Sequence, residues 1–347
     1  MIQHIHLGFE LVTGKPVAVP LGHMAVCGQT QASGKTTTLE GLVSRSGCRA
    51  IAFLTKRGEG SFRVAENIPP YFKDRTDWPF IASLLEATAS EKLKFQRAEI
   101  IKLCQDYMGP EGEWHRPDSL ADVQRNAETA LLKARGVAAR IYTELLEYLR
   151  MVVPQIELLP YTKKLNLGPG LNVMDLNDYD FPLQALVVRS VIEWVHHRAE
   201  NTIVVIPEAW KFAPKQRGSP VKMAAEEMIR QGAALKNFLW VDSQDLASVS
   251  AVITRAVKVW LFGVQRDSRE IERTLEYIPA DTAKPTKNDI QTLGLGQFIA
   301  CWERKLARVY VQPAWMSAAH AEAIALGEES VESAGVIAKD YDKEHAQ

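Results

Sequence analysis

The segment MAVCGQTQASGKTTTL, residues 24–39, decides the fold of this chain. Met24 to Cys27 form a short apolar run, residues 28–34 are small or polar, and apolar residues then recur at Leu39, Leu42 and Val43. This pattern predicts a strand, a loop and a helix, and Ile51–Leu54 predicts a second strand. A loop between a strand and a helix N-terminus directs backbone N–H groups at phosphates, so the segment predicts a nucleotide-binding loop.

The loop residues suggest individual roles in nucleotide binding. Lys35 is expected to reach the β and γ phosphates, and the Thr36 hydroxyl is expected to ligate Mg²⁺, so ATP and Mg²⁺ are the predicted cofactors. In the usual spacing the first glycine falls on Gln29, but Gly28 comes one residue earlier. Either the loop is one residue longer or Gln29 occupies the turn; the plainer alternative is an ordinary turn capped by Ser33. The predicted nucleotide-contacting residues are Gly28, Gln29, Thr30, Gln31, Ala32, Ser33, Gly34, Lys35, Thr36 and Thr37.

Two later apolar runs end in polar residues suited to hydrolysis. Ile203–Ile206 is followed by Pro207 and Glu208, and Glu208 is the candidate general base. Hydrolysing ATPases usually carry an aspartate before this glutamate, whereas Pro207 cannot coordinate a metal. The run ending Trp240–Ser243 is followed by Gln244, the candidate sensor of the γ-phosphate. The alternative is that both side chains merely cap strands or turns.

Composition limits the classes of function. The 347 residues carry 41 Lys plus Arg against 42 Asp plus Glu, which excludes a histone-like binder and an acidic disordered domain. With 46% hydrophobic residues the chain has a globular composition. Neither a signal peptide nor a long apolar span is visible, so we expect a cytoplasmic protein without membrane insertion. Four scattered cysteines predict reduced thiols rather than disulfides or a zinc site.

The order of apolar runs predicts the organisation of the chain. We expect an α/β fold with a mostly parallel sheet covered by helices, interrupted by an α-helical insertion. Long helical periodicity favours the insertion, and the Gly109–Gly112 cluster is expected to divide it into two arms. The expected parts are 1–80 and 161–316 for the core, 81–160 for the insertion, and 317–347 for a helical or disordered tail.

These motifs resemble the HerA/FtsK group of P-loop ATPases, and the resemblance extends over most of residues 7 to 315. It rests on Gly28-Gln29-Thr30, Ser33 to Thr37, Thr55 to Glu59, Ile206 to Trp210 and Ser243-Gln244. The resemblance implies a RecA-like P-loop core and a hexameric ring that hydrolyses ATP between subunits and translocates duplex DNA. It also implies a nuclease or other effector protein as partner.

The resemblance further implies an arginine that acts on the neighbouring subunit's nucleotide. Ala233 stands where the group has this arginine, and Arg230 is the substitute we name, with Arg255 and Arg266 as alternatives that the sequence does not separate.

Nucleic-acid binding requires basic side chains that neutralise phosphates. Two predicted loops supply such residues, although a solvated surface is the alternative for both. The candidates are Lys56, Arg57, Arg63, Lys215, Arg217 and Lys222.

The leading hypothesis is therefore an ATP-hydrolysing ring motor that moves nucleic acid. The alternative is a nucleotide-binding assembly or regulatory ATPase with weak hydrolysis, in a defence or mobile-element complex. Pro207, the shifted glycine and Ala233 favour the alternative.

Overall fold

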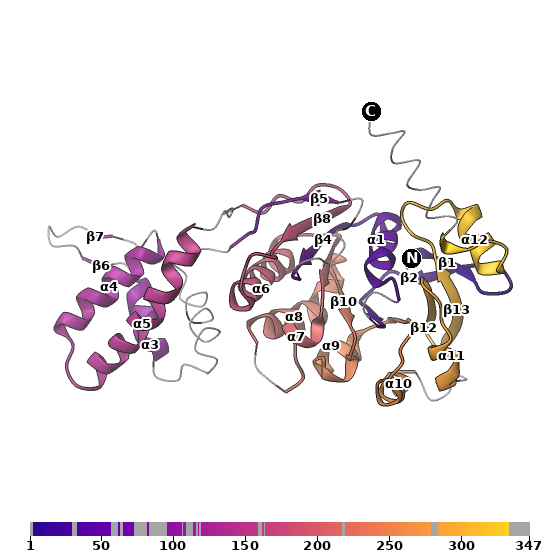
Figure 1. Cartoon of the computed structure of the whole chain (residues 1–347). Helices are drawn as coiled ribbons and strands as arrows, with labels where there is room; N and C mark the ends of the chain where they lie inside the picture. Colours follow the sequence, from indigo (N-terminus) through magenta and orange to yellow (C-terminus); the bar gives the residue numbers. More distant parts are fainter. Residues whose placement is uncertain are drawn as a thin grey trace.

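The computed structural model describes residues 3–29, 33–56, 62, 65–72, 82, 96–105, 107–108, 114–115, 117, 119–158, 162, 164–216, 219–278 and 284–332. An 11-stranded sheet forms its centre (Figure 1), in the order β2-β1-β13-β12-β11-β3-β10-β9-β4-β8-β5. The strands are β1 (His4–Glu10), β2 (Pro16–Pro20), β3 (Met24–Cys27), β4 (Arg49–Leu54), β5 (Glu66–Asn67), β8 (Leu171–Asp175), β9 (Thr202–Ile206), β10 (Phe238–Ser243), β11 (Val259–Phe262), β12 (Gln297–Trp302) and β13 (Lys305–Val311).

The parallel part of the sheet runs from β11 to β5. Strands β3, β9, β10 and β11 are buried along their whole length, as expected for parallel strands covered on both faces. β10 lies between β3 and β9 and pairs in parallel with both. This arrangement brings the ends of three strands that are distant in the sequence to one edge of the sheet. The predicted α/β fold with a mostly parallel sheet is confirmed.

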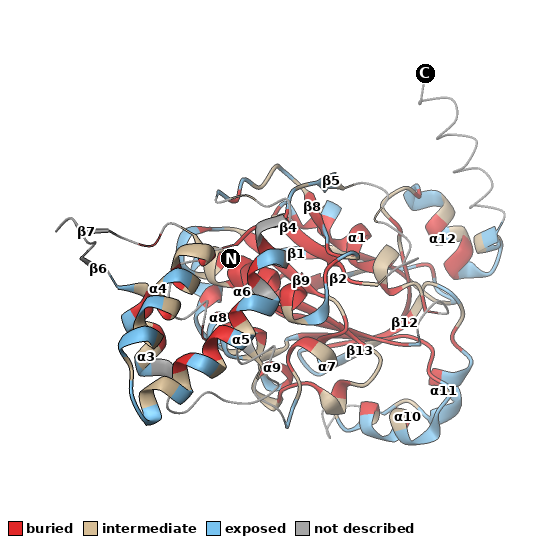
Figure 2. Cartoon of the chain, turned by 60° about the vertical axis from the view of Figure 1, so that its left-hand side comes forward, coloured by how far each residue is buried: buried red, intermediate tan, exposed pale blue. Residues whose placement is uncertain are grey.

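Helices cover both faces of the sheet. Leu39, Leu42 and Val43 of α1 pack on one face, together with Val26 and Trp240. The other face is covered by α6, α8 and α9, and Figure 2 shows the strands between these layers as mostly buried. The helices of the core are α1 (Lys35–Ser46), α6 (Phe181–Arg198), α7 (Ala209–Phe212), α8 (Pro220–Gln231), η1 (Gly232–Leu235), η2 (Leu246–Ser248), α9 (Ala251–Ala256), α10 (Ser268–Leu275) and α11 (Lys287–Gln291).

The remaining strands form an antiparallel edge. β12 and β13 form an antiparallel hairpin, and its turn residues Glu303 and Arg304 have φ values of 44° and 64°. β1 pairs with β13 and with β2, so the N-terminal residues extend the sheet. Sequence analysis did not identify these two N-terminal strands, because Gly8 and the prolines at both ends of β2 weaken the strand signal.

Three helices occupy much of the stretch in which the insertion was expected, and lie to one side of the sheet in Figure 1. Helix α4 begins with a capping box formed by Ser119 and Asp122, and it packs along α5. The predicted breaker at Gly109–Gly112 lies outside the described residues, and the domain boundaries stay a prediction. The elements here are α3 (Gln96–Cys104), β6 (Tyr107–Met108), β7 (Trp114–His115), α4 (Leu120–Lys133) and α5 (Val137–Leu158).

Helix α12 (Ala318–Leu326) packs against the antiparallel edge. Its buried residues Ala321, Ile324 and Ala325 contact a cluster that includes Phe9 and Tyr310. The first part of the predicted tail is therefore a packed helix. Among the described helices, none has the length and apolarity needed to cross a membrane.

Candidate active site

The phosphate loop connects β3 to α1 and is held at its base by Gln29. The Gln29 N–H donates to the Val264 carbonyl at 2.8 Å, and the Gln29 carbonyl accepts a hydrogen bond from the Ser33 hydroxyl at 2.9 Å. The Ser33 hydroxyl thus bonds back into the loop, and no side chain caps the N-terminus of α1. A Cβ on Gly28 would lie 2.7 Å from Ser33 Oγ, so only glycine fits there. Thr30, Gln31 and Ala32 lie outside the described residues.

Gly34 completes the turn into α1. Its φ of 74° lies in the left-handed region, which favours glycine. A Cβ at this position would also approach the Leu295 side chain to 3.3 Å. Thr36 and Thr37 follow on the first turn of α1, where helix N–H groups are free to bind an anion.

Lys35 is buried, and its ammonium group bridges two parts of the site. Nζ donates to the Gly28 carbonyl at 2.9 Å and lies 3.5 Å from an Asp242 carboxylate oxygen. Asp242 stands near the end of β10, opposite Val26 of β3. The contact with Asp242 was not predicted from the sequence, because it depends on β10 lying next to β3.

Glu208 directly follows Pro207 at the end of β9 and begins α7 in a left-handed conformation with φ of 45°. Its buried carboxylate accepts hydrogen bonds from Lys56 Nζ, from Trp210 Nε1, and from Gln244 Nε2 at 3.4 Å. Burial alone raises the pKa of the Glu208 carboxyl, but these hydrogen bonds and the Lys56 charge outweigh burial and hold the pKa below its ordinary value. Glu208 is therefore an anion at neutral pH.

The predicted residues Lys35, Glu208 and Gln244 thus come together at the carboxyl ends of β3, β9 and β10. The edge formed by the carboxyl ends of parallel strands is where α/β proteins bind ligands. Lys56 and Trp210 also contact Glu208, and neither contact was predicted from the sequence. The structure tests none of the predicted catalytic roles directly, and they stay predictions.

A second layer of buried groups fixes the loops around these residues. Gln184 of α6 donates to the carbonyls of Thr55, Leu176 and Tyr179, and so ties the segment before Lys56 to the core. The Cys27 thiol donates to the Gln244 carbonyl at 3.4 Å. Burial raises the pKa of Cys27 to about 12, so this thiol stays protonated. The four cysteines, all of which lie in the described ranges, are thiols and form no disulfide with one another.

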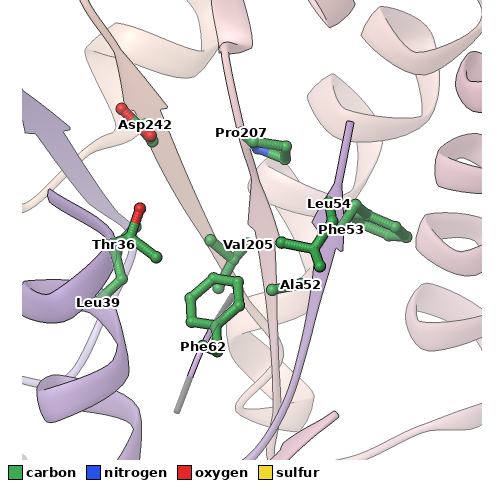
Figure 3. Close-up of a pocket in the computed structure, with 9 residues that line it drawn as sticks. All are labelled: Thr36, Leu39, Ala52, Phe53, Leu54, Phe62, Val205, Pro207 and Asp242. Carbon is green, nitrogen blue, oxygen red and sulfur yellow. The ribbon is translucent and has the colours of Figure 1, made fainter. Parts of the chain in front are cut away.

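A pocket opens beside the phosphate loop (Figure 3). Thr36 and Asp242 lie on one side of it, and Pro207 and Leu54 lie on the other. The remaining lining is apolar and includes Phe62. The pocket therefore brings a hydroxyl and a carboxylate together next to the Lys35 ammonium, in otherwise apolar surroundings.

The candidate arginines do not all lie at the same ends of the strands. Arg230 is exposed in the last turn of α8, which leads into the amino end of β10. Arg255 likewise precedes the amino end of β11. Both arginines are therefore at the amino ends of the strands, whereas Lys35 and Glu208 are at the carboxyl ends. Arg266 is exposed two residues after Val264, which contacts the phosphate loop. Only a neighbouring copy could bring Arg230 or Arg255 to a nucleotide.

The predicted nucleic-acid residues are only partly described. Lys56 contacts Glu208, and its side chain is 38% exposed. Lys215 is exposed after α7, and Lys222 Nζ donates to the Lys215 carbonyl at 2.9 Å. Arg57, Arg63 and Arg217 lie outside the described residues. The assignment of these side chains to nucleic acid stays a prediction.

Solved structures share this fold at low sequence identity. VirB4 of Thermoanaerobacter pseudethanolicus is 13% identical, with a TM-score of 0.69 over 90% of this chain and 97% of that one. The bacterial conjugative coupling protein TrwB, solved with sulphate, is 12% identical, with a TM-score of 0.57 over 90% and 94% of the two chains. The plasmid coupling protein TrwB in complex with ADP and Mg²⁺ gives a TM-score of 0.53 at 12% identity, over 84% and 85%.

No protein-family model matches the sequence, and no curated protein matches it either. These likenesses confirm the fold that the sequence resemblance implied. At this identity the likeness establishes the RecA-like P-loop fold and leaves activity to be argued from the site.

Proposed function

We propose that this chain is an ATP-hydrolysing motor of the HerA/FtsK type that binds and translocates nucleic acid, with duplex DNA as the expected substrate. The single observation that supports this most strongly is the convergence of Lys35, Glu208 and Gln244 at one edge of the sheet. A capping role for Glu208 or a turn role for Gln244 would not require the two side chains to meet. Their meeting beside a phosphate loop is what hydrolysis requires.

The residues present fit a nucleotide with Mg²⁺. Gly28 and Gly34 let the loop backbone pack closely against Ser33 and Leu295, and Lys35 supplies a buried cation. Thr36 and Asp242 line the adjacent pocket with oxygen atoms, which are the ligands that Mg²⁺ prefers. When bound, the metal ion neutralises charge on the phosphates. TrwB has been solved with ADP and Mg²⁺ on the same fold, which supports the proposed cofactors.

Glu208 would act as the general base that receives a proton from the attacking water. In the present structure its carboxylate is occupied by Lys56, Trp210 and Gln244. Gln244 would also sense the γ-phosphate, because it follows β10 next to β3, the strand that leads into the phosphate loop, and its amide contacts Glu208. The two carboxylate oxygens have about four acceptor sites, so the water would take the remaining site or replace one of these donors.

We further propose that the active form is a ring, with a hexamer expected, in which an arginine of a neighbouring copy completes the nucleotide site. The positions of Arg230 and Arg255, away from the nucleotide edge of their own chain, support an intermolecular role. Lys215 and Lys222 follow the strand that carries Glu208, so nucleic acid bound there would lie near the hydrolytic group. We also propose that the chain acts together with a nuclease or other effector protein and that it is located in the cytoplasm.

The decisive experiment measures ATP turnover by the purified protein, with and without duplex DNA. We expect turnover that Lys35→Ala abolishes and that Glu208→Gln lowers about 10²- to 10⁴-fold while ATP binding persists. A wild-type protein that binds ATP but shows no turnover in either condition would refute the motor.

That refuting result would instead support the second candidate, an assembly or regulatory ATPase in a defence or mobile-element complex. The specific observation in its favour is Pro207 in the place of the usual aspartate, together with a Glu208 carboxylate already bound by three donors. Mass photometry with a slowly hydrolysed ATP analogue and DNA tests the ring in both cases.

A further inference from the structure

Pro207 leaves the end of β9 without the carboxylate that this fold ordinarily uses beside the metal. The register of the sheet shows which residue lies next to Pro207 on the neighbouring strand. Val241 of β10 pairs with Ile206 of β9, so the next residue, Asp242, is level with Pro207 on the neighbouring strand. Neighbouring strands lie about 4.8 Å apart, a distance that an aspartate side chain can largely span.

Asp242 also faces the correct side of the sheet. Side chains alternate along a strand, and Trp240 and Val205 both pack on the face covered by α1. Asp242 and Pro207, each two residues further on, therefore point to that same face, where both line the pocket with Thr36 (Figure 3). A carboxylate and the Thr36 hydroxyl thus meet in one pocket, although they come from different elements.

The charge balance of the pocket requires a cation near Asp242. Its side chain is 12% exposed, and a carboxylate so buried among apolar groups needs a positive partner. In the present structure Lys35 provides this charge at 3.5 Å. If Lys35 pairs with nucleotide phosphates instead, a divalent cation held by Asp242 would restore the balance, since Mg²⁺ sites commonly combine one or two carboxylates with substrate phosphates.

We propose that Asp242, on the strand beside the phosphate loop, is the acidic group of the Mg²⁺ site and takes the part that Pro207 cannot. The inference rests on the proposed nucleotide-binding function. The acidic residue would then come from β10, which lies next to β3 and its phosphate loop. Pro207 follows β9, which is one strand further away.

The test uses Mn²⁺ as the probe, because its electron paramagnetic resonance signal distinguishes free from bound ions. Mn²⁺ is titrated into the full chain saturated with a non-hydrolysable ATP analogue, for wild type, Asp242→Asn and Asp175→Asn. Asp175 ends β8 at the same edge of the sheet but does not line the pocket, so it is the matched control. We expect Asp242→Asn to weaken Mn²⁺ binding about 10- to 100-fold and Asp175→Asn to leave it unchanged.

A second measurement separates metal binding from an effect on Lys35. Binding of a fluorescent ATP analogue in EDTA is expected to be equal or tighter for Asp242→Asn, because a negative charge near the phosphates is removed. Mn²⁺ affinity within twofold of wild type would overturn the inference, as would an equal loss of nucleotide binding in EDTA and in Mg²⁺. Wild-type protein that binds no nucleotide even in EDTA would instead refute the proposed function. Thermal unfolding of each variant verifies that it is folded.

Discussion

The ion pair between Lys56 and Glu208 is open to a quantitative test. The perturbation is a double-mutant cycle made of Lys56→Met, Glu208→Gln and the double variant, with the free energy of unfolding measured by urea denaturation. A hydrogen bond to a charged group contributes about 1.5 to 3 kcal/mol. The Lys56 side chain is 38% exposed and that of Glu208 is 4% exposed, so solvent screens the pair in part. We expect a coupling energy of about 1 to 2 kcal/mol at pH 7.

The same chain contains a matched control pair. Lys287 and Glu272 form an ion pair of the same residue types, but their side chains are 46% and 59% exposed. Exposed pairs contribute little, so we expect a coupling energy of about 0.5 kcal/mol or less there. The difference between the two cycles isolates the effect of burying Glu208 from that of merely pairing the charges.

The coupling energy between Lys56 and Glu208 should also depend on pH. The folded-state pKa of Glu208 lies below the ordinary value of 4.5, so its stabilising contribution is present above pH 4.5 and is lost as the pH falls through the folded-state pKa. The coupling energy should therefore be smaller at pH 4 than at pH 7. Coupling at pH 7 no larger than in the control pair would refute the reasoning.

Three further predictions concern residues that directly precede β3, β10 and α1. His23 is buried, and burial lowers its pKa to about 4. The free energy of unfolding should therefore fall as the pH drops from 6.5 towards 4, with a loss of about 2 kcal/mol between pH 7 and pH 5. The variant His23→Asn, measured by urea unfolding, should lack this loss. Asn237→Ala removes hydrogen bonds to Val195, Ala199 and Thr202 and should lower the free energy of unfolding by about 3 to 5 kcal/mol in urea; a loss below 1 kcal/mol would contradict this. Gly34→Ala should cost about 1 to 2 kcal/mol in urea denaturation, because its φ of 74° strains any residue with a Cβ, and an unchanged midpoint would show that the loop relaxes.

The sequence was sufficient for those parts of the fold that have local signals. The apolar runs at β3, β9 and β10 are continuous, so their strands and the polar residues after them could be predicted one at a time. The apolar stripe of α1 and the glycines of the loop likewise carry their own pattern. β1, which contains Gly8, and β2, which has a proline at each end, lacked such a signal.

The contacts within the site could not be predicted, because they depend on the order of strands in the sheet. Asp242 meets Lys35 only because β10 lies beside β3. Lys56 reaches Glu208 because β4 and β9 are neighbours, although more than 140 residues separate them in the sequence. The sequence pattern therefore assigned Lys56 to nucleic acid and indicated no role for Asp242, whereas the structure places both beside predicted catalytic groups.

The position of β3 in the sheet has a consequence for synthesis of the protein on the ribosome. This strand is complete at Cys27, yet its two neighbours, β10 and β11, begin at Phe238 and Val259. At about 5 to 20 residues per second, roughly 10 to 40 seconds pass before the first of them has been translated. During that time the apolar residues Met24 to Cys27 have none of their native strand partners. The phosphate loop is thus synthesised well before the strands that flank β3, and its site can assemble only after β10 and β11 have been added.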